Sequence, residues 1–195
     1  WSHGDEEIIS TDKAIEWFDL QGVGRAPSRF DYNKLENLNG YYLRGLEDDQ
    51  AVGLIEPALS ERLRHKLTDE QRNRLHAGIA GLKPRAKTLV QLAENSFFYI
   101  APRPIKIESK AAKFLDDNVK AYLLELANEL QDVNDWNNED IENLVRNFAD
   151  SRTLKLGLVA QPLRASLTGM TVSPSIFEVM VALGRFETLA RLRDL

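Results

Sequence analysis

The spacing of apolar residues predicts α-helices along nearly the whole chain. Between residues 115 and 130, apolar side chains recur every three or four positions and so lie on one face of a helix: Leu115, Val119, Tyr122, Leu126 and Leu130. Residues 141–148 repeat this spacing after the loop NDWNN, whose asparagines can cap the next helix. Strand patterns are nearly absent, so the chain is predicted to be all-α.

Capping residues and prolines predict where further helices begin. Thr68 and Gln71 form a capping box at the start of a helix that runs to about Ala80. Pro84, which follows Gly81, suits the first turn of a second helix over the segment RAKTLVQLA. These two helices form the middle part of the predicted fold.

The segment from residue 162 to residue 180 is predicted to hold a hydroxyl-rich turn between two helices. Ser173 and Pro174 repeat the order of cap and proline that marks a helix start. Gly184, after the apolar run VMVAL, is predicted to stop that helix in a left-handed conformation. A short helix over ETLARLRDL would then follow.

The first 60 residues are predicted to be a separate helical piece. Ser10 or Thr11 can cap a first helix, and FDYNKLENLNGYYLRGL predicts a second. Gly40 interrupts the second helix at a cost of about 1 kcal/mol relative to alanine. Three apolar residues are expected to face inward from it: Leu35, Leu38 and Tyr42.

The prolines in residues 100–107 predict an extended linker, because each proline restricts the residue before it to extended conformations. This linker separates two bundles. We therefore predict three parts, with a helical piece over 1–60, a middle bundle over 61–99 and a C-terminal bundle over 100–195.

Composition narrows the class of protein. Apolar residues make up 43% of the chain and cysteine is absent, which excludes disulfides, thiol catalysis and cysteine-based zinc sites. No apolar run approaches the roughly 20 residues that span a bilayer. We therefore expect a soluble, cytoplasmic monomer without membrane contact. The chain begins at Trp1 rather than methionine, so we expect it to be a piece of a longer protein.

Charge is distributed unevenly along the chain. The formal net charge is −5, which by itself argues against a nucleic-acid partner. Residues 61–87 nevertheless carry eight lysines and arginines against three acids, whereas residues 115–143 carry one lysine against nine acids. Such a basic segment can meet an anion locally, or it can be an ordinary solvated helix face.

Residue types that catalyse reactions or bind metals are not grouped in the sequence. His3 and His65 each have a single carboxylate four residues later and no third ligand nearby, and surface positions are expected for both and for His76. The glycines of LQGVGRAP lack the lysine and the preceding strand of a phosphate-binding loop. We predict no catalytic residue, no metal site and no cofactor site in this chain, which leaves a binding module.

The segment 162–180 is the best candidate for the binding surface. An arginine, small hydroxyls and a helix start suit phosphates and base edges, and unstacked RNA bases also need planar or apolar partners. Five residues provide this mixture: Arg164, Ser173, Pro174, Ile176 and Phe177. The residues alone leave two alternatives open: a capped helix start with a buried phenylalanine, or a helical protein-interaction module whose basic face meets an acidic partner.

Several blocks of the sequence, taken in order, resemble the part of bacterial glutamyl-tRNA synthetase that follows its KMSKS-type loop. The blocks are WS-x-GD-x-EI, AIEWFDL, FDYNKLENLNGYYLR, PRAKTLVQLA, QPLRASLTG and SPSIFEVMVALGR. The resemblance runs from Trp1 to Leu195. It implies a C-terminal fragment, in which residues 1–60 end the stem-contact region and two helical subdomains, 61–99 and 100–195, form the anticodon-binding cage.

The same resemblance implies that catalysis belongs to the rest of a parent enzyme. Neither an HIGH-like nor a KMSKS-like motif occurs in this chain. In the family, the domain with those motifs is an aminoacyl-tRNA synthetase that uses ATP and Mg²⁺ to ligate glutamate to tRNA. The chain itself would bind tRNA(Glu), and possibly tRNA(Gln), without a cofactor of its own.

The resemblance also implies roles for particular residues. Arg164 and the Ser173 hydroxyl would donate hydrogen bonds to anticodon bases, while Pro174, Ile176 and Phe177 would pack on splayed bases. A second side of the site would carry Lys83, Arg85 and Lys87, which meet the 3′ part of the anticodon or its phosphates. The tRNA stem and backbone would be contacted by four more basic residues: Arg25, Arg29, Lys34 and Arg44.

Within the family, selectivity between glutamate tRNA and glutamine tRNA depends on the side of the site that would carry Lys83, Arg85 and Lys87. Some members read the third anticodon base through an arginine and accept only glutamate tRNA, whereas others lack this arginine and also charge glutamine tRNA, which a transamidase later corrects. Lys83 and Arg85 are both available in this segment. The sequence leaves the choice open.

Overall fold

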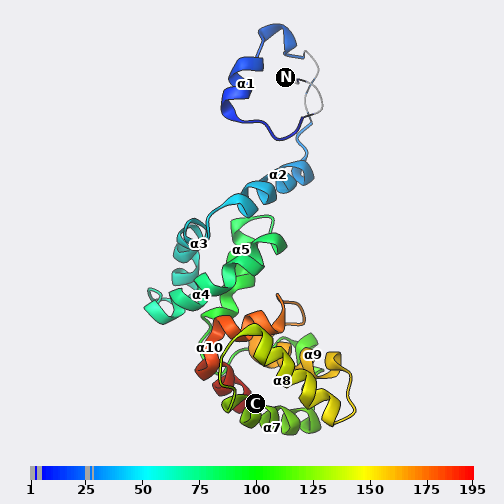
Figure 1. The fold of residues 1–195 in the computed structure, drawn as a ribbon. Coiled ribbons are helices and arrows are strands. Elements are labelled where there is room, and N and C mark those ends of the chain that lie inside the picture. Colours follow the sequence, from blue (N-terminus) through cyan, green and yellow to red (C-terminus); the bar gives the residue numbers. More distant parts are fainter. Residues whose placement is uncertain (1–2, 4–5, 25–26, 28) are drawn as a thin grey trace.

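The protein is described by a computed structural model that covers residue 3, residues 6–24, residue 27 and residues 29–195. Within these residues the chain forms α-helices and short 3-10 helices and no strand, which confirms the all-α prediction. Figure 1 shows the helices arranged along one long axis, with α1 at one end and α7 to α10 at the other. Arg25, predicted to contact the tRNA stem, lies outside the described residues.

The first part of the chain is an extended arm. It consists of three helices: α1 (Thr11–Trp17), η1 (Leu20–Gly22) and α2 (Tyr32–Gly45). Ser10 caps α1 as predicted, because its hydroxyl accepts a hydrogen bond from the amide of Lys13 at 3.2 Å. No residue of α1 or η1 is buried.

Helix α2 joins the arm to the rest of the molecule at its C-terminal end. The prediction that Leu35 and Tyr42 face inward is wrong, since 47% and 51% of these side chains are exposed. The buried residues of α2 are Gly40 and Leu43. A Cβ on Gly40 would lie 3.5 Å from the Cα of Lys87, which is an ordinary van der Waals contact, so α2 packs directly on the segment around Lys87.

The middle bundle follows α2. Its elements are α3 (Asp48–Leu63), α4 (Asp69–Leu82), η2 (Lys83–Arg85), α5 (Leu89–Ser96) and η3 (Phe97–Tyr99). The predicted capping box of Thr68 and Gln71 starts α4. The predicted start of the next helix is wrong, because Pro84 lies in η2 and α5 begins only after Thr88. The Thr88 hydroxyl caps α5 by accepting a hydrogen bond from the amide of Gln91 at 3.1 Å.

Helix α3 runs through the predicted domain boundary near residue 60. Its buried residues, including Ile55 and Leu59, share a hydrophobic core with α4 and α5, so this helix packs with the middle bundle. The division of the chain into three domains otherwise stays a prediction.

The C-terminal bundle contains the remaining helices: α6 (Ser109–Ala112), α7 (Asp117–Gln131), α8 (Asn138–Ser151), α9 (Leu156–Thr168) and α10 (Ile176–Arg193). The predicted helices over 115–130 and 141–148 correspond to α7 and α8, and Asn137 caps α8. The turn predicted from residue 162 is shorter than expected. Residues 162–168 are the second half of α9, which ends at Gly169 with φ 74°, and the loop spans 169–175.

Helix α10 differs from the prediction at its start and agrees with it at Gly184. Ser173 does not cap it, since the helix begins at Ile176 after Ser175, which makes no side-chain cap. Gly184 has the predicted positive φ, 77°, and interrupts the helix; its ψ of 162° produces a kink, and the predicted second helical segment follows and ends at Arg193. The kink therefore joins two helical segments that both pack on the core.

The two bundles share one apolar core because α10 packs against α4 as well as against α7, α8 and α9. Figure 1 shows α10 lying between the middle bundle and the helices of the C-terminal bundle. Among the described residues, no helix has the length and apolar character needed to cross a membrane.

Candidate nucleic-acid interface

A groove lies where the two bundles meet. It consists of two adjoining cavities of about 480 and 130 Å³, which share the lining residues Asn95, Phe98 and Met170. One side of this inter-bundle groove is formed by the end of α4, η2, α5 and η3, and the other by the end of α9 and the loop 169–175. The groove thus separates the two segments that the sequence singles out for RNA contact.

Arg164 is held at one side of the groove by its neighbours. Its Nε donates a hydrogen bond to the Ser173 hydroxyl at 2.9 Å, and its Nη1 donates to the side-chain oxygen of Gln161. The Ser173 hydroxyl in turn donates to the carbonyl oxygen of Pro174 at 2.8 Å. These bonds fix the guanidinium before any ligand arrives, which lowers the entropy that binding costs.

Arg85 faces this cluster from the opposite side. It lines the smaller cavity together with Ser173 and is exposed, and in the described part of the chain it forms no ion pair or hydrogen bond. Partial burial and then the charge of Arg85 lower the pKa of the Arg164 guanidinium, which nevertheless stays protonated at neutral pH. Two positive charges that repel each other across a groove favour an anion between them.

The end of α4 also touches the loop directly, since a Cβ on Gly81 would lie 3.2 Å from the Cβ of Pro174. The structure therefore brings Arg164, Ser173, Pro174 and Arg85 to one place. In the sequence, Arg85 is 79 positions from Arg164 and 89 from Pro174, and the packing of α4 on α10 makes them neighbours.

Lys83 does not belong to the open surface predicted for it. Its ammonium lies 2.6 Å from Asp48 Oδ1, a charge contact rather than an aligned hydrogen bond, and it donates to the carbonyl oxygen of Leu46 at 2.7 Å. Only 13% of the side chain is exposed. Lys83 thus ties η2 to the junction of α2 and α3, and the prediction that it meets RNA is corrected.

Lys87 lies at the same junction but is half exposed. Its ammonium is 3.9 Å from Glu36 Oε2, and its carbonyl oxygen accepts a hydrogen bond from Asn39. The long ion pair leaves this charge accessible to a phosphate.

Ile176 and Phe177 are buried, with 2% and 6% of their surfaces exposed, and Pro174 is buried too. A buried side chain offers no surface on which a base can stack, so the prediction that Pro174, Ile176 and Phe177 pack on splayed bases is corrected. Ile176 and Phe177 anchor the start of α10 in the core, as the alternative interpretation expected for Phe177.

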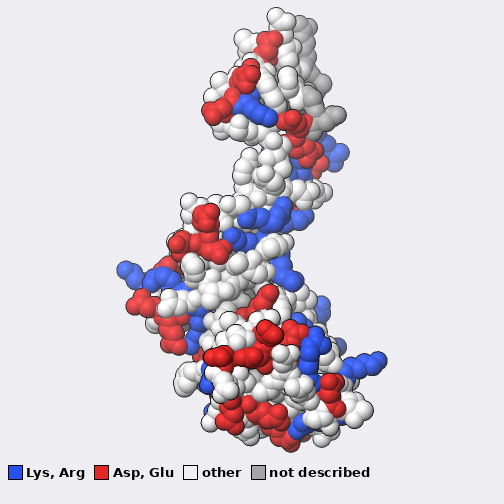
Figure 2. All heavy atoms as spheres, in the orientation of Figure 1, with Lys and Arg blue, Asp and Glu red and all other residues white. Residues whose placement is uncertain are grey.

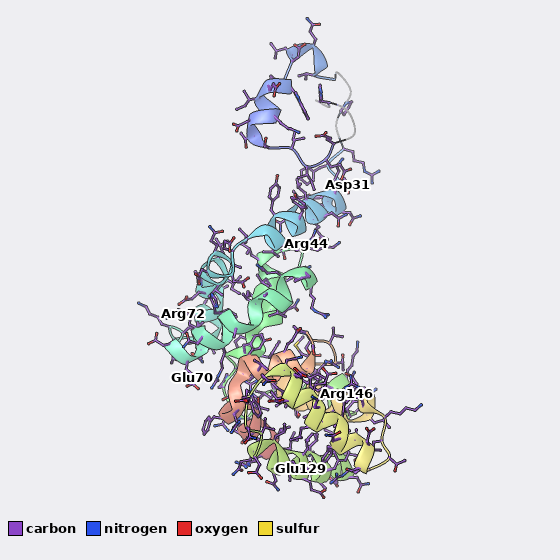
Figure 3. All side chains as sticks on the ribbon, in the orientation of Figure 1. Asp31, Arg44, Glu70, Arg72, Glu129 and Arg146 are labelled. Carbon is purple, nitrogen blue, oxygen red and sulfur yellow. The ribbon has the colours of Figure 1, made fainter. Side chains whose placement is uncertain are left out.

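The remaining basic residues predicted to contact the tRNA stem lie on or near α2. Arg29 borders a shallow hollow beside Phe30, Lys34 forms a 2.9 Å ion pair with Glu7, and Arg44 is exposed. Figure 3 shows Arg44 near the end of α2 that meets the middle bundle. Lysine and arginine side chains gather at this junction on the face in Figure 2, whereas acidic side chains are frequent over α7 and α8, with some basic ones among them.

The floor of the groove was missed by the sequence prediction. Arg62 lies with its guanidinium carbon 3.5 Å from the ring centre of Phe97, and both line the larger cavity with Asn95 and Lys106. A stacked guanidinium is a planar partner of the kind that bases use. The aromatic run FFY was the available signal, but aromatic residues at a helix end are usually core.

Much of the basic charge in residues 61–87 is used inside the protein. Arg72 forms a bidentate ion pair with Glu56, and Arg74 pairs with Glu70 and with the buried Glu187. Figure 3 shows Glu70 and Arg72 at the same edge of the middle bundle. This pairing reduces the number of lysines and arginines in residues 61–87 that are free to meet a partner.

The histidines are engaged in ordinary surface contacts. Nδ1 of His65 is 2.8 Å from the carbonyl oxygen of Lys66, and Nε2 of His76 is 2.8 Å from Asp49. In the part of the chain that the structure describes, no three His, Cys, Asp or Glu side chains are grouped so that they could hold a metal ion.

Residues 52–195 match a family described as the anticodon binding domain, and the chain belongs to this family. Within it, the chain corresponds to the anticodon-binding portion of a glutamate–tRNA ligase. It is 50% identical over 194 residues to glutamate–tRNA ligase 2 of Rhodospirillum rubrum and 52% identical over 194 residues to that of Rhodospirillum centenum. In each case the match includes 100% of this chain but 42% of the relative, so the chain spans about two fifths of their length.

Two solved structures are similar to this chain over nearly its whole length. The crystal structure of a glutamate tRNA ligase from Elizabethkingia meningosepticum in complex with its amino acid matches 96% of this chain and 36% of its own, with a TM-score of 0.80 and 25% identity. A glutamate-tRNA synthetase from Elizabethkingia anophelis matches 99% of this chain and 37% of its own, with a TM-score of 0.77 and 25% identity.

Proposed function

We propose that this chain binds the anticodon loop of a tRNA in the inter-bundle groove. The observation that carries the proposal is the arrangement around Ser173, which lines the smaller cavity with the exposed Arg85 and accepts a hydrogen bond from Arg164. The guanidinium of Arg164, which hydrogen bonds hold in place, suits the edge of a base. The guanidinium of Arg85, which is free to turn, suits a phosphate or a second base. Arg62 on Phe97 adds a planar surface in the adjoining cavity.

The proposed ligand is tRNA(Glu), supported by the names of the relatives. Arg85, rather than Lys83, is the proposed contact to the 3′ part of the anticodon, because the Lys83 ammonium is already bound to Asp48 and Leu46. An arginine can donate two hydrogen bonds to one base and so discriminate. Whether tRNA(Gln) is also accepted then depends on how Arg85 contacts the base.

The activity proposed for the whole protein is the ligation of glutamate to this tRNA with ATP and Mg²⁺ in the cytoplasm. ATP and Mg²⁺ would be bound by the part of the parent protein outside this chain. The residues described here would contribute affinity and selectivity for tRNA. The arm with Arg29, Lys34 and Arg44 would position the tRNA backbone without reading its sequence.

The test is filter binding of three transcripts at two salt concentrations: glutamate tRNA, glutamine tRNA, and glutamate tRNA with an exchanged anticodon. We expect glutamate tRNA to bind more tightly than the exchanged transcript at both concentrations, and affinity to fall steeply as salt rises. Equal binding of all transcripts would contradict anticodon recognition. Binding of an acidic protein in preference to every tRNA would support the protein-interaction module instead.

A further inference from the structure

A cluster of buried charges lies at the junction of the two bundles. Its centre is Arg191 in the second segment of α10, of which 2% is exposed, and Glu187, of which 5% is exposed. These groups are four residues apart on one helix, and the Arg191 Nε donates to Glu187 Oε1 at 2.8 Å. Burying two charges is costly, so their partners decide whether the arrangement is stable.

One nitrogen of Arg191 bonds to both sides of the inter-bundle groove. Its Nη1 donates to the carbonyl oxygen of Phe98 at 2.8 Å and to that of Leu167 at 2.6 Å. Phe98 lines both cavities from the middle bundle, and Leu167 immediately precedes Thr168, which lines the larger cavity from α9. The guanidinium therefore links the two backbone segments directly beneath the groove.

Glu187 extends this link to two further segments. Its Oε2 lies 3.2 Å from Arg74 on α4 and 3.7 Å from Arg103 in the linker between the bundles. Arg103 also lies 3.4 Å from Asp194, and Arg74 pairs with Glu70. The cluster thus joins the middle bundle, the linker and the C-terminal bundle through a single balanced set of charges.

We propose that Arg191 is a positioning residue that sets the separation of the two sides of the groove, and through it the selectivity for RNA. Ordinary apolar packing could join the bundles with equal stability, but it has no preferred direction. Hydrogen bonds from one planar guanidinium to two carbonyls fix both distance and orientation. The inference rests on the proposed function for its effect on RNA, and on geometry alone for its effect on the groove.

The test measures separation and selectivity in the same variants. The chain has no cysteine, so Val90→Cys on α5 and Lys155→Cys before α9 place a spin label on an exposed position of each bundle. Electron double resonance then gives the distribution of distances across the groove. In Arg191→Met we expect a broader distribution, and a ratio of affinities for glutamate tRNA over the anticodon-exchanged tRNA that is roughly tenfold smaller.

Two further variants separate positioning from stability. Arg191→Lys keeps the charge but cannot donate to both carbonyls and to Glu187 with the same geometry, so it should also broaden the distribution of distances. If the methionine variant does not fold, the lysine variant decides whether Arg191 sets the groove. Leu126→Ala lowers stability by a cavity in the C-terminal bundle and should leave distances and selectivity unchanged at temperatures where it is folded.

An unchanged distance distribution with unchanged selectivity in the Arg191 variants would overturn the inference. So would an equal loss of selectivity in Leu126→Ala, since that would reduce the role of Arg191 to general stability. If the unmodified chain shows no anticodon preference, the proposed function fails, while the distance measurement still decides whether Arg191 sets the groove.

Discussion

The Nε of Arg164 donates a 2.9 Å hydrogen bond to the hydroxyl of Ser173 across the loop that joins α9 to α10. This bond links the exposed face of α9 to a residue that also lines the groove opposite Arg85. It determines which guanidinium edge remains for a ligand, because Nε and Nη1 are already engaged within the protein. The Nη2 group is therefore the part of the guanidinium that we propose contacts an RNA base or phosphate.

Arg164→Ala should weaken binding of glutamate tRNA and reduce its preference over the anticodon-exchanged tRNA. The expected loss of discrimination is about 1–3 kcal/mol if the guanidinium contacts a base edge. Filter binding with both transcripts measures it. Arg146→Ala is the control, because Arg146, labelled in Figure 3, pairs with Glu142 on its own helix, α8, and lines neither cavity of the groove. An equal loss for both transcripts would identify a phosphate contact instead.

Arg85→Ala and Lys83→Ala should change different properties although the residues are two positions apart. The first should affect RNA binding and the second the stability of the fold. Removing Arg85 should weaken RNA binding and reduce the slope of log affinity against log salt by about 1, without changing stability. Removing Lys83 should lower the free energy of unfolding by about 1–3 kcal/mol, because the carboxylate of Asp48 and the carbonyl of Leu46 lose their partner.

Urea unfolding and salt-dependent filter binding of the two variants check this contrast. Both measurements are made at a temperature where each variant is folded. A Lys83 variant of normal stability but weak RNA binding would return this lysine to the RNA-binding surface.

Gly78→Ala should destabilise the protein strongly. A Cβ on Gly78 would lie 2.1 Å from Cζ of Tyr99, whose buried ring packs from η3 against α4. Either the ring or α4 has to move, which typically costs about 1–3 kcal/mol or more. Thermal unfolding measures the effect.

The matched control for that substitution is Gly53→Ala. Gly53 lies within the exposed face of α3 and has no atom near the position of a Cβ, so alanine there should raise stability by about 0.5–1 kcal/mol. If both substitutions changed the stability in the same direction, the close approach of Tyr99 to Gly78 would not explain the effect of Gly78→Ala.

Acid should weaken the contact between α3 and α4. The hydrogen bonds from Arg72, and then its charge, hold the pKa of the Glu56 carboxyl below its ordinary value of 4.5. Because the pKa is lower in the folded state, the unfolded state binds the proton more readily. The contribution of this pair is therefore complete above about pH 4.5 and is lost as the pH falls through the folded pKa.

Glu56→Gln should consequently lose less stability than the unmodified chain between about pH 7 and pH 3, as measured by urea unfolding. The difference should be modest because both side chains are partly exposed and water screens the pair. Glu61→Gln, on the same helix, should behave like the unmodified chain. An identical pH dependence in all three proteins would show that the Glu56 pair does not contribute.

Local sequence was sufficient to predict most of the secondary structure. The apolar spacing of α7 and α8 and the caps at Ser10, Thr68 and Asn137 depend on residues within one or two helical turns. The start of α5 and the length of α9 were predicted wrongly because proline and hydroxyl residues occur both at helix ends and inside helices, so local sequence does not distinguish the two positions. Thr88 and not Pro84 begins α5, and Pro162 lies inside α9.

The sequence by itself determined that the chain is helical and that it resembles one synthetase family, and it singled out Arg164 and Ser173 as candidates for RNA contact. Tertiary structure decided that Phe177 is buried, that Lys83 is held by Asp48, and that Arg85 is the basic residue opposite Arg164. These outcomes depend on contacts between segments that are distant in the chain. No pattern of neighbouring residues specifies such contacts, because the packing of α10 on α4 determines which side chains meet across the groove.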